Sequence, residues 1–135
     1  MRESPVVFFS HPKTNDEAFA RLAAALKSHG YTSNAVADTS LGEPIEQSVR
    51  QMIEKSDFVI ADLTGNNPNV MFEVGFAEGI GKSILPIVQD TERQVSPHIA
   101  GMLYVPYNPQ QPDNMIKYVL SWLKRNQPES QRIAI

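Results

Sequence analysis

Hydrophobic and polar positions along the chain follow the period of strands in some blocks and the period of helices in others. Continuous apolar runs at residues 6–9 and 58–61 are rich in β-branched and aromatic side chains, which is typical of strands buried on both faces. Between these runs, Phe19, Leu22 and Leu26 recur at helical spacing. The pattern therefore predicts an alternation of buried strands and amphipathic helices.

Weaker patterns predict the remaining elements. They are a strand over residues 31–36, a helix that begins at Pro44, a helix from Asn67 to about residue 81, a strand over residues 83–88 and a helix over residues 115–123, while residues 102–105 fit a short fifth strand. We therefore expect an α/β domain with helices on both faces of a four- or five-stranded parallel sheet. The domain should span residues 1–124, and residues 125–135 should form a loosely ordered tail.

The composition argues against several classes of protein. The net charge of −3, with no run of lysine and arginine, argues against a nucleic-acid partner. The absence of cysteine excludes a thiolate nucleophile and a cysteine-bound zinc, and the three histidines lack metal-ligand spacing, so we expect no metal. No apolar run is long enough for a signal peptide or a membrane span, so we expect a cytoplasmic protein with no membrane partner.

The helix predicted from Asn67 is apolar nearly all round and carries two acids that point in different directions. Glu73 shares its side with apolar residues, whereas Glu78 is the acid we expect in solvent. A carboxylate held half-desolvated at the ligand-binding edge of a sheet could attack a sugar carbon or stabilise a positively charged sugar. Spacing alone equally allows an acid that only suits the positive end of the helix.

Ligands of parallel sheets bind beyond the carboxyl ends of the strands, where the strand order reverses. That rule marks the loops near Ser10 and Asp62. Asp62 could orient a base or a ribose hydroxyl, or donate a proton, although its residue type favours a turn that bonds its own backbone. Ser10 and His11 could bind a phosphate or a base, although isolated polar residues in a loop are more often structural.

Three further residues around the helix start are candidates for substrate binding. Asn67 and Asn69 could present amides to a nucleotide, and the alternative is that they form turns and cap the helix. Gly75 costs roughly 1 kcal/mol relative to alanine inside a helix. A close approach of the helix to the sheet, or of a ligand to the backbone, would explain it.

Four short motifs between residues 57 and 90 carry a family resemblance: Ala61-Asp62-Leu63-Thr64, Asn67-Pro68-Asn69-Val70, Phe72-Glu73-Val74-Gly75 and Gly81-Lys82. This segment resembles the nucleoside 2-deoxyribosyltransferase-like superfamily. The resemblance implies that Glu73 is the nucleophile that attacks the anomeric carbon and that Asp62 helps to handle the base. It also implies a homo-oligomer, because neighbouring subunits complete the pocket in the transferases.

The first half of the chain, in Phe8-Phe9-Ser10, the helix from Asp16 and the segment from Gly42 to Asp57, is similar to a TIR domain. This resemblance implies a flavodoxin-like, three-layer fold. TIR enzymes that hydrolyse NAD also use a glutamate on the corresponding helix.

We interpret the chain as a nucleoside- or nucleotide-binding domain that cleaves or transfers an N-glycosidic bond. Glu73 would be the nucleophile or the stabiliser of an oxocarbenium ion, and Asp62 would assist the base. A TIR-like NAD hydrolase is one alternative, and a non-catalytic nucleotide-sensing or protein-interaction module is another. No cofactor is required, although NAD could be the substrate.

Overall fold

The computed structural model describes residues 4–12, 16–35, 45–91 and 103–127. Its elements are β1 (Val6–Ser10), α1 (Asp16–Ser28), β2 (Thr32–Ala35), α2 (Ile45–Lys55), β3 (Phe58–Asp62), the short 3-10 turn η3 (Thr64–Asn66), α3 (Pro68–Gly79), β4 (Ser83–Gln89), β5 (Val105–Tyr107) and α4 (Asp113–Asn126). The five strands form one sheet in the order β2-β1-β3-β4-β5, and every pair of neighbours is parallel. The predicted α/β class is therefore confirmed, with the fifth strand present.

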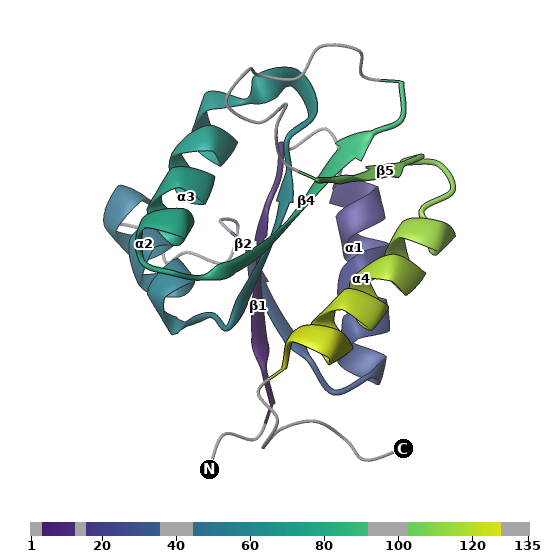
Figure 1. Ribbon diagram of the computed structural model, residues 1–135, viewed down its shortest axis with the longest axis horizontal. Coiled ribbons are helices and arrows are strands. Elements are labelled where there is room, and N and C mark those ends of the chain that lie inside the picture. Colours follow the sequence, from purple (N-terminus) through teal and green to yellow (C-terminus); the bar gives the residue numbers. More distant parts are fainter. Residues whose placement is uncertain (1–3, 13–15, 36–44, 92–102, 128–135) are drawn as a thin grey trace.

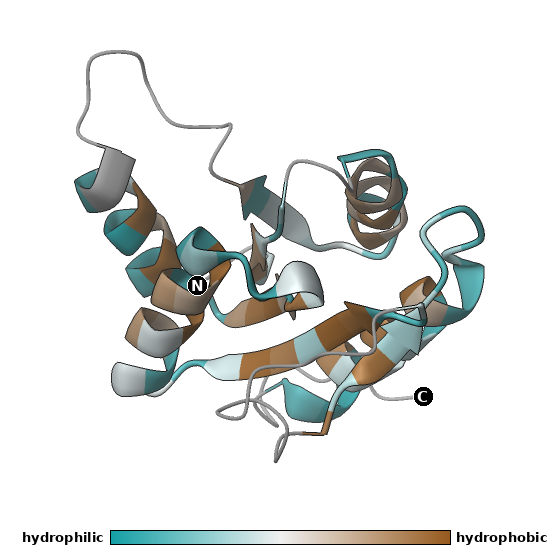
Figure 2. Cartoon of the chain, turned by 90° about the horizontal axis from the view of Figure 1, so that it is seen from above, coloured by the Kyte–Doolittle hydropathy of each residue, from teal (hydrophilic) through white to brown (hydrophobic). Residues whose placement is uncertain are grey.

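The helices form two layers, one on each face of the sheet, and a hydrophobic cluster lies between each layer and the sheet (Figure 1). The first cluster packs α1 and α4 against Val7 and Phe9 of β1. The second packs α2 and α3 against Phe8 of the same strand. Successive side chains of a strand point to opposite faces, so β1 contributes to both clusters in alternation. Figure 2 shows hydrophobic residues along the strands and on the helix sides that face them.

The strand order reverses between β1 and β3, because β2 lies on one side of β1 and all later strands lie on the other. Ser10 is the last residue of β1 and pairs with Ala61, next to the last residue of β3. The ligand-binding rule for parallel sheets therefore marks the carboxyl ends of these two strands, as the sequence predicted.

The last strand and the last helix differ from the prediction. β5 begins at Val105, where the predicted strand over residues 102–105 ends. α4 begins two residues earlier and ends three residues later than expected, so Arg125 and Asn126 are helical. Residues 128–135 lie outside the described part of the chain. The loosely held tail predicted from residue 125 is thus wrong for its first residues.

Hydrogen bonds at the amino edge of the sheet bring the two ends of the described chain together. The N–H of Thr32 donates to the carbonyl of Pro5 at 2.9 Å, and the hydroxyls of Ser4 and Thr32 lie 2.9 Å apart. On the side of α4, the amide of Gln127 donates to the hydroxyl of Tyr31 at 2.6 Å, and both side chains are buried. Both ends of the described chain therefore lie opposite the carboxyl edge.

Candidate functional site

The start of α3 is fixed by its own sequence. The side chain of Asn67 accepts the N–H groups of Asn69 at 2.9 Å and Val70 at 3.3 Å, and Pro68 occupies the first helical position. This is the capping role that the sequence allowed for Asn67, because the first N–H groups of a helix have no partner within it. The cap fixes where α3 begins, and the buried residues of the helix are Val70, Glu73, Val74 and Ala77.

Glu73 is a buried acid held by a serine of the sheet. Its side chain is 6% exposed, and Oε1 accepts the hydroxyl of Ser10 at 2.5 Å. Burial raises the pKa of Glu73 above its usual value, and the Ser10 hydrogen bond opposes this because it favours the charged form. Among the described residues, no lysine, arginine or histidine forms an ion pair with Glu73. The carboxylate is therefore desolvated without a cationic partner.

Strand alternation explains why Ser10 reaches Glu73. Ser10 follows Phe8 by two positions and so lies on the face of the sheet that α2 and α3 cover. Ser10 is fully buried, and its hydroxyl is used by Glu73. The direct substrate contact that the sequence suggested for Ser10 stays a prediction, and it would compete with this hydrogen bond.

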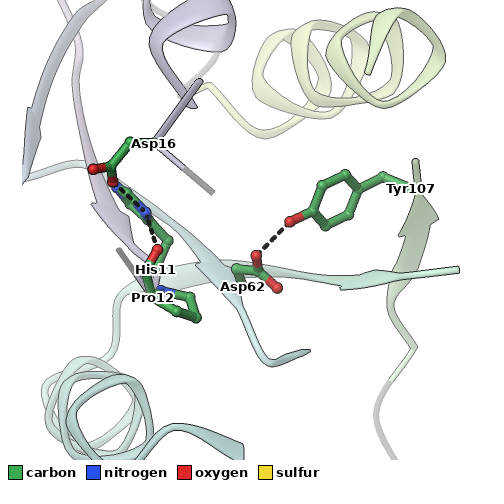
Figure 3. Close-up of polar contacts among 5 residues, drawn as sticks. All are labelled: His11, Pro12, Asp16, Asp62 and Tyr107. Atoms are coloured by element: carbon green, nitrogen blue, oxygen red, sulfur yellow. Dashed lines mark hydrogen bonds and ion pairs between the residues drawn. The ribbon is translucent and has the colours of Figure 1, made fainter. Parts of the chain in front are cut away.

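His11 turns to the opposite face of the sheet. Its ring stacks on Phe19 of α1 with centroids 4.0 Å apart, and Nδ1 lies 2.8 Å from the carbonyl of Pro12 and 3.8 Å from Asp16 (Figure 3). Adjacent residues of an extended chain point in opposite directions, so one of the pair Ser10 and His11 must face α1. The structure brings the Ser10 side chain to Glu73 and places the His11 ring on Phe19 of α1 instead.

Asp62 is completely buried at the end of β3 and is bonded on both oxygens. Oδ1 accepts the N–H of Thr64 at 3.0 Å and its hydroxyl at 2.6 Å, and Oδ2 accepts the hydroxyl of Tyr107 (Figure 3). The Thr64 hydroxyl in turn accepts the N–H of Gln89 at 2.8 Å. The turn-forming role that the sequence favoured for Asp62 is present, and a buried tyrosine adds to it.

The two candidate catalytic acids are not brought together. Tyr107 belongs to the cluster beneath α1 and α4, so Asp62 points to that face, whereas Glu73 and Ser10 lie on the face covered by α2 and α3. Sequence reasoning missed Tyr107. No local signal marked it, because its role depends on β5 pairing with β4 beside β3.

A cavity of about 620 Å³ opens at the carboxyl edge of the sheet. Its lining residues come from the segments after β1, β3 and β5, from the last residue of β4 and from the start of α3: Pro12, Thr64, Gly65, Asn67, Pro68, Gln89, Pro109 and Gln110. None of these side chains is charged, and three of them carry carboxamides. Ser10 and Glu73 are not among the lining residues, although Pro12 lies two residues after Ser10 and Asn67 begins the helix that carries Glu73.

Gly75 lies on the outer side of α3. It is exposed, and a Cβ atom built on it would meet no atom within 4 Å. The close approach of helix to sheet that the sequence suggested is therefore wrong. Asn69 is also exposed, and its N–H is taken up by the cap.

The described residues contain no group of three or more histidine, aspartate or glutamate side chains that could hold a metal ion. No helix in the described ranges is both long and apolar enough to cross a membrane.

A family model of the TIR domain matches residues 7–119. The chain belongs to the TIR domain family. The match begins in β1 and ends within α4, so it includes the strand that carries Ser10 and the helix that carries Glu73. The similarity to a TIR domain predicted from the sequence is confirmed.

Solved structures share the fold of this TIR domain at low sequence identity. The TIR domain of the Toll-related receptor TRR-2 from Hydra magnipapillata is 18% identical with a TM-score of 0.70, over 89% of this chain and 98% of that one. The CMP N-glycosidase BcmB of Clostridium botulinum is 20% identical with a TM-score of 0.67, over 87% and 98%. The 2-desoxiribosyltransferase of Leishmania mexicana is 17% identical with a TM-score of 0.64, over 87% and 97%.

These likenesses confirm the flavodoxin-like, three-layer fold. They include a 2-desoxiribosyltransferase and a TIR domain, which are the two groups that the sequence resembled. No curated protein matches the sequence.

Proposed function

We propose that this TIR domain cleaves or transfers the N-glycosidic bond of a nucleoside or nucleotide, with Glu73 as the nucleophile or as the stabiliser of an oxocarbenium ion. The observation that carries the proposal is a desolvated carboxylate, bonded to Ser10 and without a cationic partner among the described residues, on the helix that begins at the ligand-binding edge of the sheet.

The chemistry of the bond explains why such a carboxylate is useful. As an N-glycosidic bond breaks, positive charge develops on the sugar ring. A carboxylate in a water-poor site attracts that charge more strongly than one in water, because the surroundings screen the interaction less. The cost of burying Glu73 without a cation is thus offset in the transition state, where the substrate supplies the missing positive charge.

The cavity at the carboxyl edge suits the rest of such a substrate. Its volume lies within the usual range for small-molecule sites. Three carboxamides line the cavity, and a carboxamide carries the donor and acceptor groups that edges of nucleobases require. The oxygen of Asn67 is already used by the helix cap, so Asn67 would present its amino group. The names of two structural neighbours, a 2-desoxiribosyltransferase and a CMP N-glycosidase, point to the same class of substrate.

Asp62 receives a supporting role in this proposal. Its oxygens already accept the groups of Thr64 and Tyr107, so direct contact with a base would require one of these bonds to break. Through Thr64, Asp62 holds the N–H of Gln89 and so fixes one wall of the cavity.

A protein-interaction module is the second candidate, and the outer side of α3 favours it. Phe72 is 47% and Ile80 is 43% exposed, and Gly75 and Gly79 beside them leave open space. An apolar helix side of this kind suits self-association into a homo-oligomer. Light scattering after gel filtration, on the wild type and on Phe72→Ser, measures it directly: a monomer in both samples would exclude self-association through α3.

Release of free base tests the catalytic proposal. The full chain is incubated with NAD, with nucleosides and with nucleoside monophosphates, and the products are separated by chromatography. Glu73→Gln removes the carboxylate, and Glu78→Gln is the matched control, because Glu78 is an exposed acid of the same helix. Wild type and Glu78→Gln should release base, and Glu73→Gln should not.

The other outcomes separate the alternatives. Nicotinamide as the released base identifies an NAD hydrolase, and a new nucleoside formed after addition of a second base identifies a transferase. Binding seen by calorimetry without release supports a nucleotide-sensing module. If no base is released and no ligand binds, both functions are refuted for these ligands.

A further inference from the structure

We infer that Ser10 is a positioning residue, which holds Glu73 through Oε1 and leaves Oε2 as the atom that meets the anomeric carbon of the substrate. This inference rests on the proposed function and adds the orientation of the nucleophile to it. The sequence suggested that Ser10 touches the substrate, whereas the geometry assigns it to the carboxylate.

The hydroxyl of Ser10 is placed by the sheet. Ser10 ends β1, a central strand, and pairs with Ala61 of β3. Its side chain is fully buried and donates to Oε1 of Glu73 at 2.5 Å. A donor carried by a paired strand is held more precisely than one carried by a loop, so the acid is oriented before any ligand arrives.

The two oxygens of Glu73 are not equivalent. Oε1 accepts the Ser10 hydroxyl, and Oε2 makes no hydrogen bond to the described residues. No fully buried side-chain oxygen or nitrogen in the described ranges lacks a partner, so Oε2 must retain some contact with solvent. Oε2 is therefore the oxygen that a ligand can reach.

The reaction follows from this difference. In the first step Oε2 forms a bond to C1′ of the sugar, and the bond from C1′ to the base nitrogen breaks. The electron pair leaves with the base, which takes a proton from water. In the second step a water oxygen bonds to C1′, the pair of the C1′–Oε2 bond returns to Glu73, and the water proton is released to solvent.

The other charged groups of the elements packed against α3 do not replace Ser10. On α2, Arg50, Glu54 and Lys55 are exposed, as is Glu78 on α3 itself. Asp62 of β3 is bonded to Tyr107 on the other face, and His11 after β1 stacks on Phe19. Before β4, the Nζ of Lys82 donates to the carbonyl of Glu54 at 2.8 Å, near the amino edge.

The test measures the titration of Glu73 itself, in protein whose glutamates carry ¹³C at the carboxyl carbon. The Glu73 signal is assigned as the one that Glu73→Gln removes. Ser10→Ala deletes the donor. Ser56→Ala is the matched control, because Ser56 is also buried and its hydroxyl donates at 2.6 Å to the carbonyl of Met52 instead of to Glu73.

Loss of a hydrogen bond to the charged form should raise the pKa of Glu73 in Ser10→Ala by roughly one to two pH units relative to wild type. Ser56→Ala should leave it in place. If Ser10→Ala does not fold, Ser10→Cys fills the site with a somewhat larger group that is only a weak donor, and it should shift the pKa in the same direction. An equal Glu73 pKa in wild type and in the Ser10 variant that folds would overturn the inference.

The titration needs no substrate, so its result stands even if no base is released from any compound. Where base is released, the acidic limb of kcat/KM should move to higher pH by the same amount in Ser10→Ala and should stay in place in Ser56→Ala. An acidic limb that does not move with the Glu73 pKa would overturn the assignment of Ser10 to the nucleophile.

Discussion

The hydroxyl of Tyr107 should contribute more to the stability of the fold than a tyrosine hydroxyl usually does. Tyr107 lies on the edge strand β5 and donates to Asp62 at the end of β3, so one hydrogen bond ties two strands across β4. Tyr107→Phe deletes the hydroxyl and keeps the ring in its place in the core. It therefore removes the hydrogen bond to Asp62 while the ring stays packed.

The magnitude follows from the burial of Asp62. A hydrogen bond to a charged group contributes about 1.5–3 kcal/mol, and a carboxylate at 0% exposure cannot replace it with water. For a chain of 135 residues, the entropy of unfolding is about 0.28 kcal/mol per kelvin. The expected fall in Tm for Tyr107→Phe is thus about 5–11 °C.

Thermal unfolding followed by circular dichroism measures the shift, with Tyr118→Phe as the matched control. Tyr118 is 46% exposed and stacks beneath Arg125 with its ring, so loss of its hydroxyl should change Tm by less than about 2 °C. Asp62→Asn combined with Tyr107→Phe should be less damaging than the two single changes added together. Equal shifts in Tyr107→Phe and Tyr118→Phe would refute the reasoning.

Three further predictions concern α3 and the turn that follows it. Because the pKa of Glu73 is raised in the folded state, the unfolded chain releases this proton first as the pH rises above about 4.3, and folding loses stability from there up to the folded pKa. Glu73→Gln should therefore gain in Tm relative to wild type as the pH rises from about 4.3 towards the folded pKa, and the gain should stay constant above it. A difference in Tm that does not change with pH would contradict the raised pKa. Gly75→Ala should raise the free energy of unfolding by about 0.5–1 kcal/mol, because helix propensity improves and the new methyl meets no neighbour. Gly81→Ala should lower it, because Gly81 has a φ of +82°. Urea unfolding compares the two, and a destabilised Gly75→Ala would show that something packs against this position.

The fold was predictable because each of its layers leaves a local pattern. The buried strands β1 and β3 are continuous apolar runs, and the start of α3 is marked by Asn67 and Pro68, whose roles depend only on their immediate neighbours. The prediction placed β5 too early, because a strand of three residues that pairs with β4 alone in the described sheet shows little periodicity.

The site was predictable only in part, for a physical reason. Periodicity showed that Glu73 is the buried acid of its helix, and the structure adds its partner Ser10. The separation of Ser10 from His11, and of Asp62 from Glu73, depends on which face of the sheet each residue meets. That choice is made by the packing of helices distant in sequence, so no local pattern reveals it.

Two hydrogen bonds, between Thr32 and Pro5 and between Gln127 and Tyr31, hold the ends of the described chain at one edge of the sheet. They therefore bear on where a fusion partner or a surface can be attached. Both ends of the described chain leave at the amino edge, whereas the cavity opens at the carboxyl edge. A second domain or a surface tether joined directly at Ser4 or Gln127 would therefore be attached at the edge opposite the cavity. A fusion made there should keep the hydrogen bonds of Thr32 to Pro5 and of Gln127 to Tyr31 intact.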